Sequence, residues 1–131
     1  MRNWYVIDAS SCVLGRLSTV AAKLLQGKGK VEYVPNKDVG DFVVVTNAAK
    51  IRLTGKKLEQ KIDYRHSGYP RGDKYVLYKD LMEKNPEKAV KLAISGMLPK
   101  TTLRAKALKR LKIFKSEAKH LEGKCQKVQI M

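Results

Sequence analysis

Two short runs of apolar residues give the chain its strongest secondary-structure signals. The first covers residues 4–7 (WYVI) and is ended by Asp8, and the second is the apolar centre (FVVV) of the segment over residues 41–47 (DFVVVTN). Unbroken apolar runs of this length are typical of strands that are buried on both faces, as in a parallel sheet. The pattern therefore predicts two buried strands, each bounded by polar residues.

The residues between these two runs repeat with the spacing of a helix. The apolar positions that share one side, at about 100° per residue, are Leu14, Leu17, Val20 or Ala21, and Leu24. Gly27 follows as a typical helix stop. A strand, a helix and a second fully apolar strand are typical of a parallel βαβ unit. The sequence therefore predicts an α/β fold.

Two further strands are predicted from weaker patterns. Residues 61–66 alternate, with Ile62, Tyr64 and His66 on one side, and their polar positions place this strand near an edge of the sheet. Residues 112–114 (KIF) form a short candidate strand late in the chain. The segment over residues 67–74 consists of turn-forming residues and predicts a loop.

Two helices are predicted between these strands. A short one covers residues 77–84, and the next begins at Asn85, with Pro86 in the first helical position, and runs to Gly96. From Ser116 onward the chain is polar and weakly patterned. We expect one α/β domain over residues 1–115 and a basic tail over residues 116–131 that is extended or disordered.

The stretch from Gly96 to Lys115 contains no acidic residue. Leu103, Ala107 and Leu111 predict the apolar side of a helix, with most of the cations on the other side. An exposed helix usually interleaves glutamate with lysine, because pairs of opposite charge support it. A helix of like charge is favoured when a polyanion binds it, and a solvated helix face is the alternative.

The net charge also indicates a polyanionic partner. The chain carries 28 lysines and arginines against 12 acidic residues, a formal net charge of +16, and half of this excess lies in residues 100–131. Such a field attracts nucleic acid or an anionic membrane. The membrane is the weaker alternative, because no apolar run approaches the roughly 18 residues of a spanning helix.

The loop over residues 67–74 holds an aromatic side chain among cations. Tyr69 is flanked by Arg65, Arg71 and Lys74. A tyrosine in such a setting can stack on an unpaired base while the cations hold phosphates. Local packing of Tyr69 over the turn is the alternative, and the sequence does not decide between the two.

The sequence does not predict catalysis or a bound cofactor. Residues 27–30 (GKGK) follow a helix instead of opening one, so they are not a dinucleotide-binding loop. Asp63, His66 and Ser67 are the residue types of a catalytic triad. Neighbours on one strand point to different faces, however, so these residues cannot easily form a proton relay.

A metal site and a secreted location are also not predicted. Cys12, Cys125, His66 and His120 lack the spacing of zinc ligands, and the two cysteines are expected to be reduced thiols. Because the first strand-like run begins within the first few residues, we expect no signal or transit peptide. We therefore expect a cytoplasmic protein.

Seven blocks of residues, in order along the chain, match a known family. They are residues 4–9 (WYVIDA), 14–17 (LGRL), 40–45 (GDFVVV), 53–58 (LTGKKL), 64–70 (YRHSGYP), 84–87 (KNPE) and 96–100 (GMLPK). These blocks resemble the bacterial-type family of the thirteenth protein of the large ribosomal subunit. The chain departs from the family at Arg104-Ala105, where a Gly-Arg pair is typical, and from residue 116 onward.

The resemblance implies both a fold and a function. The implied fold is a three-layer α/β/α arrangement with a four-strand, mostly parallel sheet. The implied function is that of a structural constituent of the large ribosomal subunit, which binds large-subunit ribosomal RNA and supports subunit assembly and translation without catalysis. The expected location is a ribosome in the cytoplasm, with an organellar ribosome as the alternative.

The expected partners are large-subunit ribosomal RNA and neighbouring ribosomal proteins. Some family members act on messenger RNA as repressors, so messenger RNA is a further candidate partner. An enzyme acting on nucleotides and a free-standing regulator of messenger RNA are the alternative functions. The candidate RNA-binding residues are Lys28, Lys30, Lys37, Arg65, His66, Tyr69, Arg71, Lys74, Lys100, Arg104, Lys106, Lys109, Arg110, Lys112 and Lys115.

Overall fold

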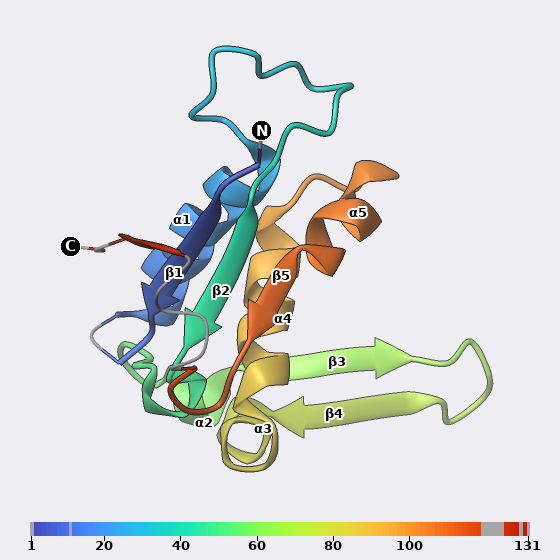
Figure 1. The fold of residues 1–131 in the computed structure, drawn as a ribbon. Helices are drawn as coiled ribbons and strands as arrows, with labels where there is room; N and C mark the ends of the chain where they lie inside the picture. Colours follow the sequence, from blue (N-terminus) through green and yellow to red (C-terminus); the bar gives the residue numbers. More distant parts are fainter. Residues whose placement is uncertain (1, 11, 119–124, 129, 131) are drawn as a thin grey trace.

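A four-stranded parallel sheet forms the centre of the protein (Figure 1). The computed structural model describes residues 2–10, 12–118, 125–128 and 130. The strands are β1 (Trp4–Asp8), β2 (Phe42–Thr46), β5 (Leu111–Ile113) and β6 (Gln126–Val128), in the spatial order β5-β2-β1-β6. Helices pack around this sheet, which is consistent with the predicted three-layer α/β/α class.

The two apolar runs form neighbouring strands, as predicted. In the parallel register of β1 and β2, Val6 lies opposite Val44 and Ile7 lies opposite Val45. The side chains of Val44 and Val45 point to opposite faces of the sheet, and both are fully buried. Because both faces are covered, the run shows no alternation of polar and apolar residues.

Helix α1 (Leu14–Gln26) connects β1 to β2, as the βαβ prediction required. It buries Leu14, Leu17, Ala21 and Leu25 against the sheet and against α4 (Pro86–Met97). It ends at Gly27, which has the left-handed φ of 75° and donates its amide to the carbonyl oxygen of Leu24. The predicted helix stop is therefore confirmed.

The other helices surround the sheet and its loops. Their bounds are η1 (Ala48–Lys50), α2 (Lys57–Gln60), α3 (Tyr78–Lys84) and α5 (Leu103–Lys109). Helix α3 and the start of α4 confirm the predictions for residues 77–84 and for Pro86 in the first helical position. Asn85 occupies the cap position of α4, but its side chain makes no capping hydrogen bond.

The predicted apolar side of the basic helix is wrong at Leu111. Helix α5 ends at Lys109, and the amide of Arg110 bonds to the carbonyl oxygen of Ala107 as the last turn closes. Leu111 then opens β5, where it pairs with Val43. Leu111 is buried from a strand rather than from the helix, because parallel pairing with β2 begins there.

The third predicted strand exists but does not join the central sheet. Residues Ile62–His66 form β3, which pairs antiparallel with β4 (Asp73–Leu77) in a hairpin that extends away from the body (Figure 1). Strand β4 was not predicted, because every one of its residues is exposed and its sequence carries no burial pattern.

Strand β6 lies in the tail and was also not predicted. Its three residues pair in parallel with Tyr5, Val6 and Ile7 of β1. Residues 119–124, 129 and 131, which belong to the same predicted tail, lie outside the described residues. The division of the chain at residue 115 stays a prediction.

Candidate nucleic-acid interface

The lysines between residues 100 and 115 form an exposed basic surface. Five of them are exposed: Lys100, Lys106, Lys109, Lys112 and Lys115. None of the five takes part in an ion pair within the described part of the chain. The carboxylate of Glu87 lies close to one of them, since it accepts the backbone amide of Lys115 at 3.0 Å. The five ammonium groups stay outside any ion pair of the described residues, so an external polyanion can neutralise them. We call these five residues the α5 lysines, because Lys106 and Lys109 lie on α5 and the other three lie just before or after it.

Lys112 extends this surface onto one face of the sheet. It lies on β5 between Leu111 and Ile113 and pairs with Val44 of β2. Leu111 and Ile113 belong to or pack against the main core, whereas Lys112 is exposed. Since successive side chains on a strand alternate, Lys112 points to the opposite face of the sheet.

Arg110 is not part of the exposed surface, so its predicted outward placement is wrong. Its relative exposure is 5%. Its Nη1 donates to Asp38 Oδ2 at 2.7 Å, and its Nη2 donates to the carbonyl oxygen of Leu25 at 3.1 Å. Asp38 also accepts a hydrogen bond from Arg2 Nη2, at 3.2 Å. Arg110 therefore holds elements together.

Gly40 makes room for this buried ion pair. A β-carbon at position 40 would lie 1.8 Å from the carbonyl oxygen of Leu25 and 2.7 Å from Arg110 Nη2. No side chain fits there without moving backbone. The backbone of Gly40, α1 and Arg110 therefore meet at one tightly packed point.

The loop over residues 28–40, the 28–40 loop, carries three of the candidate cations. Lys30 is partly buried, and its Nζ donates to Asp41 Oδ1 at 2.5 Å and to the carbonyl oxygen of Val39 at 3.0 Å. Asp41 is 3% exposed and also accepts the amide of Asn3 at 2.9 Å. Lys30 therefore fixes the loop to the start of β2, whereas Lys28 and Lys37 are exposed.

A cavity of about 360 Å³ lies between the 28–40 loop and α5. Four of the candidate cations line it: Lys28, Lys37, Arg104 and Arg110. Arg104 is partly buried, and its Nη2 donates to Ser95 Oγ at 2.5 Å. The structure therefore brings together cations that are far apart in the sequence. We call this space the loop–α5 cavity.

The tip of the β3–β4 hairpin presents Tyr69 to solvent. Tyr69 is 76% exposed, and Arg71 beside it has a left-handed φ of 58°, which is unusual for a residue other than glycine. Ser67 and Gly72 close the turn, the amide of Ser67 donating to the carbonyl oxygen of Gly72 at 3.2 Å. Such exposure favours a surface role for Tyr69 over local packing.

Basic and aromatic side chains lie on opposite faces of the hairpin stem. Arg65 lies opposite Lys74 on one face, whereas Tyr64 lies opposite Tyr75 on the other, with ring centroids 5.1 Å apart. The hydrogen bond that Tyr64 donates to Asp73 Oδ1 raises the pKa of the tyrosine. The basic face can contact phosphates, while the aromatic face is free of lysine and arginine.

His66 lies on the aromatic face and is held by the turn. Its Nδ1 accepts a hydrogen bond from the amide of Gly68 at 2.9 Å, and its Nε2 lies 3.4 Å from Asp73 Oδ1. An Nδ1 that accepts a hydrogen bond leaves the proton on Nε2 in the neutral ring. His66 therefore braces the turn, and its predicted contact with RNA stays a prediction.

Apart from Lys30, which pairs with Asp41, the candidate residues form three groups in space: the α5 lysines, the cations of the loop–α5 cavity, and the hairpin residues. Sequence reasoning missed Tyr33 and Asp38, which also line the cavity. Both lie in a segment without regular structure, where the sequence has no periodic pattern. The motif that could have drawn attention to them is the run of lysines that surrounds them.

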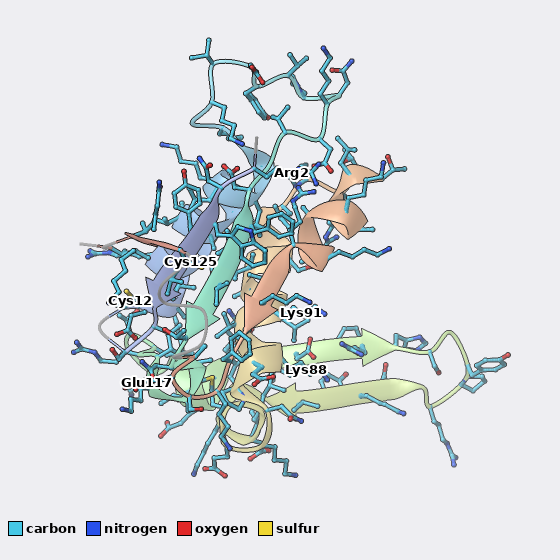
Figure 2. All side chains as sticks on the ribbon, viewed as in Figure 1. Arg2, Cys12, Lys88, Lys91, Glu117 and Cys125 are labelled. Atoms are coloured by element: carbon cyan, nitrogen blue, oxygen red, sulfur yellow. The ribbon has the colours of Figure 1, made fainter. Side chains whose placement is uncertain are left out.

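The described residues hold no cluster that suggests a metal centre. No three histidine, cysteine or acidic side chains come together among them, and His120 lies outside them. Cys12 and Cys125 both keep their thiols, as predicted (Figure 2). Over the same part of the chain, no helix is long and apolar enough to cross a membrane.

Comparison with known proteins agrees with the resemblance found in the sequence. The model of the family described as Ribosomal protein L13 matches residues 2–120. A large ribosomal subunit protein uL13 of Salinispora arenicola is 54% identical over 127 residues, which are 97% of this chain and 86% of that protein. The protein of the same name from Renibacterium salmoninarum is 56% identical over 114 residues, 87% of this chain and 78% of that protein.

A third relative shows the same level of similarity. The large ribosomal subunit protein uL13 of Streptomyces avermitilis is 54% identical over 116 residues, 88% of this chain and 79% of that protein. The family match extends over β1, β2 and β5 of the sheet, over the helices and over the hairpin, and it ends before β6. The chain therefore belongs to the ribosomal protein L13 family.

Proposed function

We propose that the chain is a structural constituent of the large ribosomal subunit and binds large-subunit ribosomal RNA through its exposed basic surfaces. The observation that carries this proposal is the set of α5 lysines, exposed and outside the ion pairs of the described residues, on a chain of the ribosomal protein L13 family. An RNA backbone supplies a closely spaced row of negative charges that fits them.

The role that follows is mechanical and electrostatic rather than catalytic. The family consists of structural ribosomal components, and its relatives are named for the large subunit. Neutralising phosphates lets RNA segments that would otherwise repel approach one another, and this supports subunit assembly. Neighbouring ribosomal proteins are partners in the same particle. No feature of the described residues points to messenger RNA in particular, so messenger RNA is not part of the proposal.

The hairpin supplies a second contact region. Arg65 and Lys74 share one face of its stem, and Tyr69 and Arg71 lie at its exposed tip. Because the hairpin extends away from the body, it can reach an RNA segment that α5 does not touch (Figure 1). Two separated regions would tie together two parts of the folded RNA.

The salt dependence of binding tests the proposal. We expect the affinity for large-subunit ribosomal RNA to fall with salt, with a log–log slope of about −0.7 to −0.9 per phosphate contacted. The double variant Lys106→Gln, Lys109→Gln should weaken binding and flatten this slope by about one to two units. Filter binding between low and moderate salt measures both quantities.

A matched double variant provides the control. Lys79→Gln, Lys84→Gln removes the same charge from α3, at the far end of the molecule from α5 (Figure 1). Its slope should stay that of the unchanged protein. Equal flattening by both double variants would mean that binding depends on net charge alone, and this would contradict the proposed surface.

A further inference from the structure

The loop–α5 cavity combines apolar walls with a positively charged rim. Tyr33 and Pro35 contribute from the 28–40 loop, and Met97, Pro99 and Leu103 contribute from the end of α4 and the start of α5. The cations on the lining are Lys28, Lys37, Arg104 and Arg110, against the single acid Asp38. The cavity is therefore suited to a flat, partly apolar ligand that carries negative charge.

Two arginines of this cavity hold donors that have no acceptor. The Nε atoms of Arg104 and Arg110 are both buried and make no hydrogen bond within the described residues. Arg110 has its other guanidinium nitrogens bound to Asp38 and to the carbonyl oxygen of Leu25. A buried donor without a partner costs free energy. These Nε atoms have almost no accessible surface, so a ligand with oxygen or nitrogen acceptors would remove that cost only if the guanidinium groups turned towards the cavity.

The size of the cavity limits the ligand further. A volume of about 360 Å³ is at the lower end for small-molecule pockets and is too small for a folded segment of RNA. A base in a double helix is stacked on both sides and cannot enter. An unstacked base can enter, and it offers a planar face to Tyr33 and acceptors to the arginines.

We propose that the loop–α5 cavity binds one unpaired nucleotide of RNA. The base lies against Tyr33 and the apolar wall around Leu103, and its phosphate lies near Lys28 and Lys37. This inference rests on the proposed function, since the RNA that supplies the nucleotide is the one bound by the α5 lysines. A free mononucleotide has the same chemistry, and the test must separate the two sources.

Photo-crosslinking tests where the nucleotide lies. Large-subunit ribosomal RNA transcribed with thiouridine is bound to the full chain, irradiated and digested, and the crosslinked peptides are identified by mass spectrometry. We expect crosslinks from unpaired nucleotides to the segments over residues 31–37 and 97–104. Crosslinks confined to other segments would overturn the inference.

Binding by a wall variant tests the contribution of the base. Tyr33→Ala should weaken RNA binding about fivefold or more, as expected for loss of one base–aromatic stack. The slope against salt should not change, because Tyr33 carries no charge. Val31→Ala is the matched control, since Val31 is fully exposed on the same loop and does not line the cavity.

The outcomes separate this inference from the proposed function. If Tyr33→Ala binds like Val31→Ala while the Lys106, Lys109 double variant binds more weakly, the cavity is not a nucleotide site and the proposed function stands. If no variant changes binding to ribosomal RNA, both fail. Saturable binding of free AMP, GMP, CMP or UMP that Tyr33→Ala abolishes, without the crosslinks, would contradict RNA as the source.

Discussion

At the residue scale, the ion pair between Arg110 and Asp38 joins three separate parts of the chain. Asp38 belongs to the 28–40 loop, Arg110 follows α5, and the carbonyl oxygen of Leu25 belongs to α1. The exposed Arg2 adds a third charge to Asp38. Arg110 and Arg2 both pair with Asp38, but Arg110 is buried and Arg2 is exposed. The loss of Asp38 and the loss of Arg2 should therefore lower the stability of the fold by different amounts.

Removal of Asp38 should cost more stability than removal of Arg2. Asp38→Ala leaves the buried Arg110 without its counter-charge and should lower the free energy of unfolding by about 3 kcal/mol. Arg2→Gln removes a solvent-exposed partner and should lower it by about 1 kcal/mol or less. Urea unfolding followed by circular dichroism measures both values. Equal losses would show that the pair with Arg110 does not stabilise the fold.

Asp8 couples the stability of the fold to acid pH. Burial favours the neutral form, but the amide of Ser10, the side-chain amide of Asn47, the hydroxyl of Ser10 and the charge of Lys50 together lower the pKa of Asp8 below its ordinary value of 3.8. A carboxyl group with a lowered pKa in the folded state stabilises that state above its unfolded pKa. The stabilisation is lost as pH falls through the folded pKa.

The variant Asp8→Asn isolates this contribution. It should be less stable than the unchanged protein near neutral pH, where the Asp8 carboxylate accepts from Ser10 and Asn47 at 3.0 Å each. The difference should shrink as pH falls below about 4. Unfolding curves at several pH values check this, and a difference that does not depend on pH would argue against a role for the charge of Asp8.

At the element scale, the sequence predicted the parts of the fold whose burial leaves a periodic trace. The strands are apolar throughout over residues 4–7 and 42–45, and α1 repeats its leucines at helical spacing. Strand β4 is exposed along its whole length, so no such trace exists. Strand β6 has three residues, and its place depends on pairing with β1. Pairing across the chain cannot be deduced from local pattern.

The hairpin tip separates two interpretations of Tyr69. If its ring stacks on an unpaired base, Tyr69→Ala should weaken binding to ribosomal RNA about fivefold or more without changing the melting temperature. If the ring only packs over the turn, the melting temperature should fall and binding should stay the same. Filter binding and thermal unfolding of the same variant measure both. The high exposure of Tyr69 favours the first result.

At the scale of the whole molecule, the fold places some basic side chains on the surface and buries others. The exposure of the α5 lysines could be predicted, because their stretch has no acid and an apolar stripe beside it. The burial of Arg110 could not be predicted, because its partner Asp38 lies 72 positions earlier in the chain. The loop–α5 cavity was missed for the same reason, since it forms only where the 28–40 loop meets α5.

Sedimentation of cell extract through a sucrose gradient tests most directly whether this chain is a component of the large ribosomal subunit. We expect the chain to sediment with large subunits and to remain with them after a high-salt wash, because contacts at several regions dissociate together. The Lys106→Gln, Lys109→Gln variant should be released at lower salt. Recovery of the unchanged chain only in the light fractions at the top of the gradient would contradict the account.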